Sequence, residues 1–542
     1  MSREQAEIRN PILRGFHPDP SIVRVGEDYY MATSTFQWFP GVQIHHSRDL
    51  VHWRPLGRPL DRPGQLDMTG NPDSGGVWAP CLSYDDGAGL FYLVYTDVKS
   101  HAGAFKDTHN YVVTAPAIEG PWSDPVYLNS SGFDPSMFHD DDGRKWIVNM
   151  QWDFRKGKDA FNGIYLREYS VNEGQLVGPS RKIYAGSELG LTEGPHLYKQ
   201  DGRYYLMVAE GGTSYEHAVT TARSRTLEGP YETDPRGPML TSRHAPELPL
   251  QKAGHASLVR TQSGEWYIAH LCGRPLEGAD RRCNLGRETA LQRCEWTADG
   301  WLRLASGGNT PETIVRGPAL PAHPFPSVPD KDDFDREALG LQWQTLRQPF
   351  AEAWATLTER PGFLRLRGME SPNSRFRHSL VGRRQQAFVC EAATVVEFEP
   401  ETYQQMAGLM YYYNSQNYYY LRIGRDEALG KNIGIIAGDH GVYDEHTEPH
   451  IPIPEGTPVH LKLELNGREL RFRYSLDGQD WQGIGPTLDA SKISDEYATH
   501  LVDGYFTDWG FTGAFVCLCA HDLSGAGRHA DFDWFVYREK EE

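Results

Sequence analysis

The chain has 542 residues, more than one hydrophobic core usually supports, and this length predicts two domains. The formal net charge of −19 argues against nucleic acid or an anionic membrane as a partner and is compatible with a soluble protein acting on a neutral ligand. No apolar run has the length of a signal peptide or a membrane span, and the seven cysteines are mostly scattered, so we expect reduced thiols and a cytoplasmic location.

The N-terminal part of the chain repeats one strand–turn–strand unit. In one copy, Glu193 opens an apolar segment and lies 11 positions before Tyr204, which follows a polar turn. The other copies begin at Asp19, near Pro80, at Asp134 and at His255. Further short strands indicate four strands per unit. Four-stranded units that repeat about every 55–62 residues are typical of a β-propeller, in which neighbouring sheets cover each other's faces, so we predict five blades.

A proline-rich stretch separates this repeat from the rest of the chain. Residues 317–329 read GPALPAHPFPSVP, which resists both helix and central strand and predicts a semi-rigid linker. From residue 330, alternating or apolar runs with turn residues between them predict a β-sandwich of about 200 residues. The predicted protein is therefore all-β: a five-bladed β-propeller over residues 1–316, the linker, and a β-sandwich over residues 330–542.

Three carboxylates begin the first strands of three different predicted blades, at Asp19, Asp134 and Glu193. A propeller would bring them together at the mouth of its central cavity. Glycoside hydrolysis needs one protonated and one ionised carboxyl group flanking the scissile bond. A third carboxylate would raise the pKa of the acid by like-charge repulsion, so three acids suit this chemistry. Each alone could be an ordinary turn residue, but three at repeat positions favour a site.

A calcium site is the main alternative for this cluster, because the three acids and His255 could ligate Ca²⁺. We predict no cofactor and no metal ligand, and a Ca²⁺ ion in the propeller channel is left open. The pair Cys517 and Cys519 has no second pair at zinc-binding spacing.

Aromatic side chains lie near the same strand starts, including Phe36, Trp38, Trp78 and Trp152. Most such residues belong to cores, but sugar rings stack on aromatic faces, and we select Phe36, Trp78 and Trp152 as site-lining residues. His255 and Arg287 of the fifth unit are further candidates. The arginine can donate hydrogen bonds to hydroxyls and hold a carboxylate ionised, with a surface salt bridge as the alternative.

At these residues the chain resembles the β-xylosidases of glycoside hydrolase family 43. The resemblance rests on NPILRGFHPDPSIVRVGEDYY, STFQWFPGVQIHHSRDLVHW, GGVWAPCLSY, GFDPSMF, TEGPHLY, GHASLV and LGRETALQ. The C-terminal DWGFTGAFVCL resembles the accessory sandwich of the longer xylosidases. The resemblance implies a five-bladed propeller, a concanavalin-like jelly-roll sandwich, an inverting mechanism and a homo-oligomer.

By motif position, the resemblance implies that Asp19 is the general base, that Glu193 is the general acid, and that Asp134 tunes the pKa of the acid and orients the sugar. It also implies a xylose subsite lined by Phe36, Trp78, Trp152, Thr213, His255 and Arg287. Phe511 of the sandwich would reach over the pocket and help to close it.

The predicted reaction is release of D-xylose from the non-reducing end of β-1,4-xylo-oligosaccharides, with α-L-arabinofuranosidase as a side activity. A pocket closed by the second domain favours this end-wise cleavage. Two alternatives stay open: an enzyme that is mainly an α-L-arabinofuranosidase, and a carbohydrate-binding propeller without catalysis.

Overall fold

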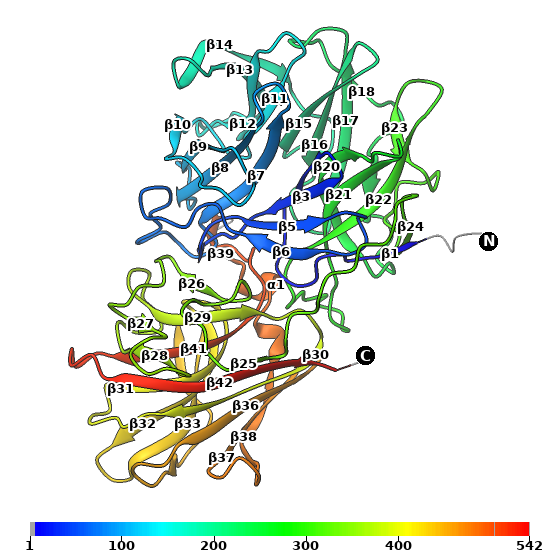
Figure 1. Ribbon diagram of the computed structural model, residues 1–542. Helices are drawn as coiled ribbons and strands as arrows, with labels where there is room; N and C mark the ends of the chain where they lie inside the picture. Colours follow the sequence, from blue (N-terminus) through cyan, green and yellow to red (C-terminus); the bar gives the residue numbers. More distant parts are fainter. Residues whose placement is uncertain (1–5, 503–504, 541–542) are drawn as a thin grey trace.

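The structure of the protein is a computed structural model that describes residues 6–502 and 505–540 (Figure 1). Two β-rich bodies lie one above the other in this view. The helices of the described chain are η1 (Ala490–Lys492) and α1 (Asp495–Ala498), of three and four residues. Neither could cross a membrane. The all-β prediction is confirmed.

Five antiparallel sheets of four or five strands in the N-terminal body are the blades of a propeller. Blade 1 consists of β2 (Ser21–Val25), β3 (Asp28–Thr33), β5 (Gln43–Ser47) and β6 (Arg54–Gly57). Blade 2 consists of β7 (Gly76–Asp85), β8 (Leu90–Ser100), β9 (Asp107–Ala115) and β10 (Val126–Asn129). Blade 3 consists of β11 (Ser136–His139), β12 (Lys145–Trp152), β13 (Phe161–Ser170) and β14 (Gln175–Tyr184). Blade 4 consists of β15 (Glu193–Gln200), β16 (Arg203–Glu210), β17 (Ala218–Ser224), β18 (Glu232–Thr233) and β19 (Leu240–Thr241). Blade 5 consists of β20 (Gln251–Arg260), β21 (Trp266–Gly273), β22 (Glu288–Trp296) and β23 (Leu302–Leu304).

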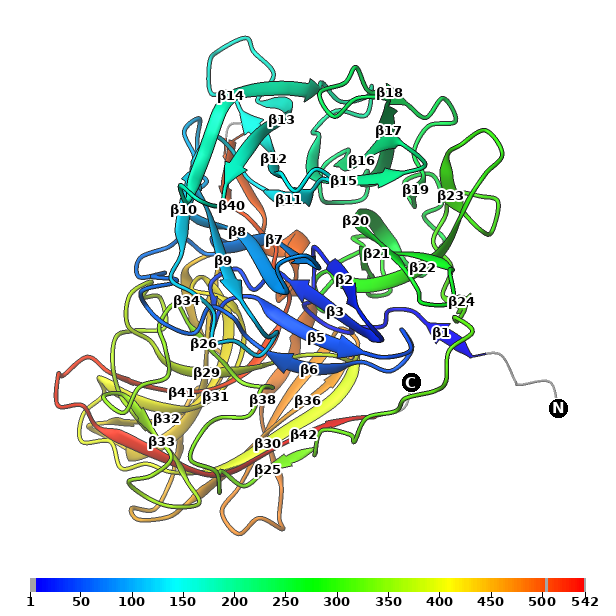
Figure 2. The same cartoon turned by 45° about the horizontal axis from the view of Figure 1, so that its top comes forward.

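The first strands of the five blades form a closed ring around one axis (Figure 2). β2 contacts β7, β7 contacts β11, β11 contacts β15, β15 contacts β20, and β20 returns to β2. A hydrophobic cluster fills the space between every two neighbouring blades. Between blades 4 and 5, for example, Met207 and Val219 pack with Leu258 and Ile268. Each sheet therefore buries both faces against its neighbours, and the five-bladed propeller is confirmed.

Hydrogen bonds between its two ends close the N-terminal body. β1 (Glu7–Arg9) pairs with β24 (Ile314–Arg316). Ile8 and Val315 from these strands add to the cluster between blades 5 and 1. The two short strands thus cover the seam where the first and last blades meet.

The C-terminal body is a sandwich of two antiparallel sheets. One sheet contains β25 (Lys331–Asp332), β27 (Ala355–Thr356), β28 (Leu364–Arg367), β30 (Val389–Glu397), β36 (Val459–Asn466), β37 (Glu469–Ser475), β38 (Gln482–Asp489) and β42 (His529–Glu539). The other contains β26 (Gln344–Leu346), β29 (Ser379–Arg384), β31 (Gln405–Asn414), β32 (Asn417–Asp426), β33 (Gly430–Asp439), β34 (Val442–Glu445), β35 (Ile451–Pro452) and β41 (Phe515–Asp522). A separate pair is formed by β39 (His500–Val502) and β40 (Tyr505–Asp508).

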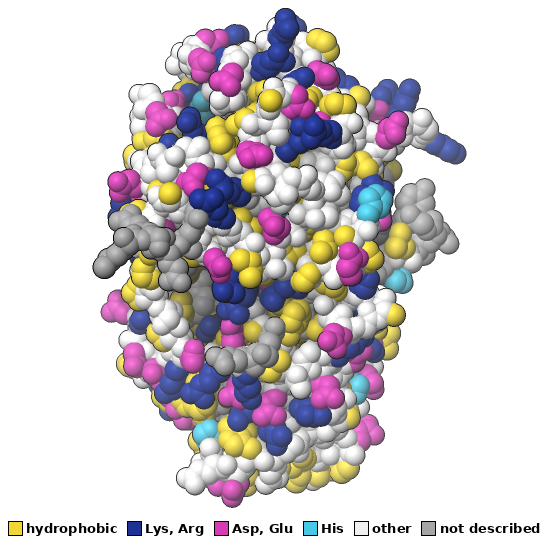
Figure 3. Space-filling view, turned by 90° about the vertical axis from the view of Figure 1, so that its right-hand side faces the viewer, with side chains coloured by type: hydrophobic (Ala, Val, Ile, Leu, Met, Phe, Trp, Pro, Cys, Tyr) yellow, Lys and Arg dark blue, Asp and Glu magenta, His cyan; other side chains and the backbone are white. Residues whose placement is uncertain are grey.

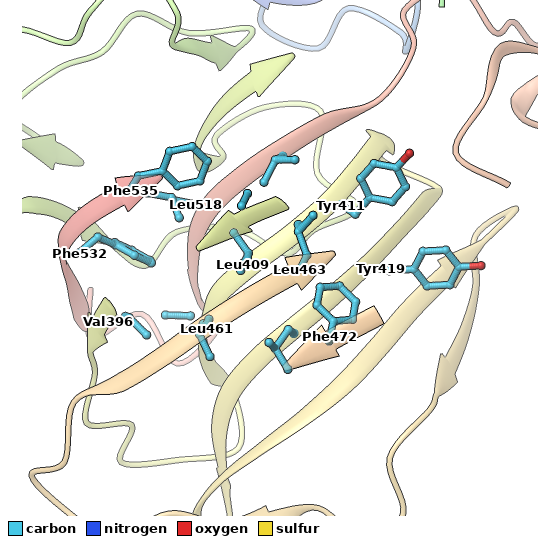
Figure 4. Close-up of a cluster of buried hydrophobic side chains, with 14 of the residues drawn as sticks. Val396, Leu409, Tyr411, Tyr419, Leu461, Leu463, Phe472, Leu518, Phe532 and Phe535 are labelled. Carbon is cyan, nitrogen blue, oxygen red and sulfur yellow. The ribbon is translucent and has the colours of Figure 1, made fainter. Parts of the chain in front are cut away.

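Alternating apolar residues of the two sheets form the sandwich core (Figure 4). Along β36, buried positions alternate with partly exposed ones, so Leu461 and Leu463 point inward. They belong to one buried cluster with Leu409 and Leu518 of the opposite sheet. The alternation read from the sequence is the pattern of a sheet with one buried face, and the predicted sandwich is confirmed.

A strand from the N-terminal part of the chain joins the sandwich. β4 (Trp38–Phe39) pairs with β26 at the edge of the second sheet. The Trp38 indole stacks on the Phe515 ring, with centroids 3.8 Å apart. Trp38 is therefore a buried residue of the contact between the two bodies rather than a site residue. Because β4 crosses from one body to the other, the division of the chain at residues 317–329 stays a prediction.

The surface mixes both signs of charge. Figure 3 shows Lys and Arg side chains interspersed with Asp and Glu over the face in view. On that face the excess negative charge of the chain does not gather into one large acidic patch.

Candidate active site

In every blade, a residue with a left-handed backbone conformation (positive φ) lies just before the first strand or within it. The φ angles are 55° at Asp19, 34° at Ala79, 54° at Asp134, 54° at Gly194 and 46° at His255. In four of the blades, the next residue is proline. The left-handed backbone conformation points the side chain at this position in a different direction from the one a continuous strand would give. This conformation, repeated in every blade, determines which side chains face the site.

In blade 4 this repeated position is Gly194, so Glu193 lies one residue before the positions of Asp19 and Asp134. The three acids are therefore not equivalent, which corrects the interpretation of Glu193 as a repeat-matched residue. Asp134 Oδ2 accepts a hydrogen bond of 3.1 Å from the Gly194 N–H, and this contact joins blades 3 and 4. Glu193 itself does not have the left-handed backbone conformation of Asp19 and Asp134.

Asp19 lies among hydrogen-bond donors and positive charge. Its Oδ2 accepts a bond of 2.6 Å from the Ser34 hydroxyl, and its Oδ1 lies 3.2 Å from Arg287 Nη1 and 3.7 Å from His255 Nδ1. Burial raises the pKa of Asp19, but Arg287, His255 and Ser34 together outweigh burial and leave this pKa below its usual value. The Asp19 carboxylate is therefore ionised at neutral pH.

The surroundings of the other two acids shift their pKa values in the opposite direction, upward. Burial raises the pKa of Glu193 well above its usual value, and the charges of Asp134 and Asp19 raise it further. Burial and the charge of Asp19 also raise the pKa of Asp134, although the Gly194 N–H opposes the shift. One site thus contains an ionised carboxylate beside carboxyl groups that keep a proton, which is the division that acid–base catalysis requires.

Arg287 connects the acids to the aromatic residues. Its Nη1 donates a bond of 2.7 Å to Thr213 Oγ1 as well as contacting Asp19. Its guanidinium carbon lies 5.3 Å from the ring centroid of Phe36 and 5.1 Å from that of Phe511. Cation–π contacts at these distances restrict the position of the guanidinium between the two rings.

The predicted aromatic residues are arranged in two groups. Phe36, Trp78 and Phe511 contact one another, with centroids 5.8–6.0 Å apart. Trp152 lies farther out: its ring is 6.5 Å from that of Phe133, which contacts Trp78 at 5.4 Å. The structure therefore brings Phe36, Trp78, Thr213, His255, Arg287 and Phe511 together around Asp19 and places Trp152 behind an intervening phenylalanine.

Phe511 reaches the site on a loop of the sandwich that docks on the propeller. The Phe511 carbonyl accepts a bond of 3.4 Å from Arg287 Nη2, and the Ala514 N–H donates to the Asn284 carbonyl at 2.8 Å. Gly513 (φ 72°) packs directly against Gly286, and a Cβ at Gly513 would lie 2.8 Å from the Gly286 Cα. Only two glycines allow the backbones to approach this closely.

Sequence reasoning missed two residues that support the acids. Ser34, the partner of Asp19, opens the stretch STFQWFPG, but nothing in that stretch assigns this serine to Asp19. Glu210 is fully buried and accepts four hydrogen bonds, from Ser187 N, Ser187 Oγ, Thr192 Oγ1 and Thr220 Oγ1. These bonds hold the loop that leads directly into Glu193. For Glu210, the sequence offers one signal: an acidic residue at the end of an apolar strand.

Among residues 6–502 and 505–540, no group of three or more His, Cys, Asp or Glu side chains is arranged to hold a metal ion. The expectation of no cofactor stays a prediction. All seven cysteines are buried free thiols.

Comparisons with known proteins agree with this geometry. Residues 8–302 match the family described as "Glycosyl hydrolases family 43", and residues 331–538 match "Beta xylosidase C-terminal Concanavalin A-like domain". The chain belongs to glycoside hydrolase family 43. It is therefore a glycoside hydrolase with a concanavalin-like second domain.

Similar proteins match over almost their full length. The hydrolase is 51% identical to a xylosidase/arabinosidase 43B of Humicola insolens, over 98% of each chain. It is 48% identical to a β-xylosidase of Bacillus subtilis, over 98% of this chain and 100% of the other. The solved structure of a xylan β-1,4-xylosidase from Bacillus halodurans C-125 is 58% identical, covers 98% of this chain and 100% of its own, and has a TM-score of 0.95.

Proposed function

We propose that this hydrolase is a β-xylosidase of xylan degradation, which releases D-xylose from the non-reducing end of β-1,4-xylo-oligosaccharides and inverts the anomeric configuration. The observation that carries the proposal is the opposite electrostatic setting of Asp19 and Glu193 within one site. The choice of xylose is supported by the names of the similar proteins.

In the proposed mechanism, Asp19 is the general base and Glu193 is the general acid. A water molecule attacks the anomeric carbon and loses a proton to the Asp19 carboxylate as the new C–O bond forms. The glycosidic C–O bond breaks, and its oxygen takes the proton of Glu193. Burial keeps the proton on Glu193 at neutral pH, and once Asp134 ionises at higher pH its charge raises the pKa of Glu193 further. Each step uses the protonation state that the surroundings favour.

Arg287 has two roles in this proposal. Its contact with Asp19 keeps the base ionised, and its remaining N–H groups can donate to sugar hydroxyls. Phe36, Trp78 and Phe511 supply apolar faces on which a pyranose ring can lie. Because Phe511 comes from the second body and touches Arg287, the sandwich bounds the site, which supports cleavage at a chain end.

α-L-Arabinofuranosidase activity is the second candidate, because the Humicola insolens relative is named for both activities. Side-by-side assays with 4-nitrophenyl β-D-xylopyranoside and 4-nitrophenyl α-L-arabinofuranoside decide which activity dominates. Higher kcat/KM on the xyloside supports the proposal, and the reverse result makes the arabinofuranosidase the main function.

Xylobiose hydrolysis by three forms of the enzyme tests the proposal. The wild type releases xylose, and Asp19→Asn loses activity on xylobiose and on 4-nitrophenyl xyloside. Glu193→Gln loses far more activity on xylobiose, because nitrophenolate leaves without a proton and xylose does not. Equal losses of Glu193→Gln on both substrates would remove Glu193 from the acid role. Absence of xylose release by the wild type would reject the function.

Two finer expectations accompany this function: a cytoplasmic location and a homo-oligomer. Seven buried free thiols support a reducing compartment. The support for an oligomer is the family resemblance, and light scattering on the purified protein measures its mass directly.

A further inference from the structure

A line of aromatic side chains leads from the acids to the surface. Phe36, beside Arg287, is only 2% exposed, and Trp78 and Trp152 are partly exposed. Beyond Trp152, Phe154 is 54% exposed and Phe105 is 69% exposed. The two ends of the line therefore differ: Phe36 is buried beside the reacting groups, and Phe105 and Phe154 face solvent, with the buried Phe133 between Trp78 and Trp152.

The outer end of this line is firmly joined to the site. Trp152 Nε1 donates a bond of 2.8 Å to the Ala104 carbonyl, in the loop between β8 and β9. The Lys106 ammonium of the same loop lies 4.4 Å from the Trp152 ring and 5.9 Å from the Trp509 ring. Trp509 in turn contacts Phe511, with centroids 5.1 Å apart. The loops of two blades and the sandwich therefore meet at Lys106 and Trp152.

Phe105 and Phe154 form an exposed pair at this place. Their centroids are 4.7 Å apart and their planes are inclined by 37°. They come from different blades, on the β8–β9 and β12–β13 connections. Single exposed apolar residues are ordinary, but a contacting aromatic pair next to a catalytic site is not explained by core packing.

We propose that Phe105 and Phe154 form a binding site for the leaving-group part of a xylo-oligosaccharide, beyond the sugar attached to the scissile bond. The occupant is a β-1,4-linked xylopyranose unit, whose apolar C–H faces stack on phenyl rings. Lys106 donates to its hydroxyls: an ammonium group has three N–H donors, one of which bonds to the His101 carbonyl at 2.7 Å. This site rests on the proposed xylosidase function.

A sugar suits this place better than a second copy of the chain. Two phenyl rings offer far less area than the roughly 1,000 Å² that a stable protein interface needs. The pair is linked to the catalytic site through the Trp152–Ala104 hydrogen bond and the contacts of Lys106, and the terminal sugar must lie next to Asp19. The rest of the oligosaccharide then extends outward in the direction of Phe105 and Phe154.

The double variant Phe105→Ala/Phe154→Ala tests the site, with kcat/KM measured on xylobiose and xylotetraose. We expect about fivefold lower kcat/KM on xylotetraose, through KM, because this contact is made equally in ground and transition states. Xylobiose is too short to reach the pair and should be unaffected. Tyr403→Ala, which removes a 66% exposed aromatic ring from the sandwich, is the matched control and should change neither value.

Equal effects on both substrates, or no effect on xylotetraose, would overturn the proposal. A lower mass of the double variant in light scattering would show that the pair is an interface between copies, which also overturns it. Failure of the proposed function differs from failure of this binding site, because in the first case the wild type releases no xylose from xylobiose. In that case, calorimetric binding of xylotetraose still tests the site, and equal affinity of wild type and double variant would reject it.

Discussion

Arg287 Nη1 lies 3.2 Å from Asp19 Oδ1, and this contact keeps one carboxylate ionised in a site where its neighbours are protonated. Without it, less would oppose the effect of burial, and the pKa of Asp19 would rise. The contact thus separates base from acid. It also links blade 5 to blade 1, so the closure of the propeller is part of the catalytic arrangement.

Replacing Arg287 with methionine should move the acidic limb of the kcat/KM–pH profile to higher pH. Asp19 must be ionised to act as a base, and loss of the neighbouring positive charge raises its pKa, so activity is lost sooner as pH falls. The profile on 4-nitrophenyl xyloside measures this. Thr213→Val removes the other Nη1 partner of Arg287 and should leave the limb within a few tenths of a pH unit. An unmoved limb in Arg287→Met would mean that Arg287 does not control the base.

Asp134→Asn should move the alkaline limb to lower pH. Burial raises the pKa of Glu193 first, and the Asp134 charge raises it further. Removing that charge lowers the pKa of Glu193, so the acid loses its proton at a lower pH. The asparagine carbonyl can still accept the Gly194 N–H, which preserves the local geometry. An alkaline limb at the wild-type pH would contradict the role of Asp134.

The stability of the same variant provides a second measurement. The folded-state pKa of Asp134 is raised above its unfolded value, so its contribution to stability is fully present below about pH 4 and is lost as pH rises through the folded pKa. The asparagine side chain of the variant cannot ionise and avoids this loss. Relative to wild type, Asp134→Asn should therefore gain Tm at pH 8 and gain none at pH 4. A gain of equal size at both values would point to a change in packing.

Glu210→Ala should weaken the general acid without touching substrate. It leaves four donors unsatisfied and releases the loop before Glu193, at a cost of about 1–3 kcal/mol for each group that stays buried and unpaired. We expect a lower Tm and a larger loss of kcat on xylobiose than on 4-nitrophenyl xyloside. Glu210→Gln, which keeps acceptors for two of the donors, should restore part of both. Equal loss on the two substrates would make Glu210 a purely structural residue.

Gly513→Ala should raise KM by displacing the loop of Phe511. A Cβ there would lie 2.8 Å from the Gly286 Cα, so one of the two backbones must shift. Gly525 is a matched control, since it also has a positive φ, of 79°, but a Cβ would meet nothing within 4 Å. Gly525→Ala therefore isolates the conformational cost, of about 1 kcal/mol, from the effect of the contact. The same KM in both variants would show that loop docking does not support binding.

The fold could be predicted from the sequence because similar residues recur at the start of several blades of the propeller. The copies that begin at Asp19 and Asp134 share the Asp-Pro-Ser signature, and alternation along β36 revealed the sandwich. The offset of Glu193 was missed because the repeated feature is a backbone angle, found at Gly194, which side-chain identity does not disclose.

Long-range contacts explain the other misses. β4 has two residues, and its partner β26 lies about 300 positions later, so no local pattern could assign Trp38 to the sandwich. Glu210 and Ser34 are recognisable only from the atoms that they contact. Sequence motifs identified the residues around the acids, including Arg287, which keeps Asp19 ionised, whereas these two hydrogen-bond partners could be located only in three dimensions.

The anomeric form of the first product tests the division between Asp19 and Glu193 most directly. Proton NMR of 4-nitrophenyl β-D-xylopyranoside hydrolysis, in which the one sugar released is the one that water attacks, shows which anomer leaves the enzyme when it is recorded before mutarotation. α-D-Xylose should appear first, because water activated by Asp19 attacks from the face opposite the leaving group. Initial release of β-D-xylose would mean retention, and it would contradict the role of Asp19 as a base.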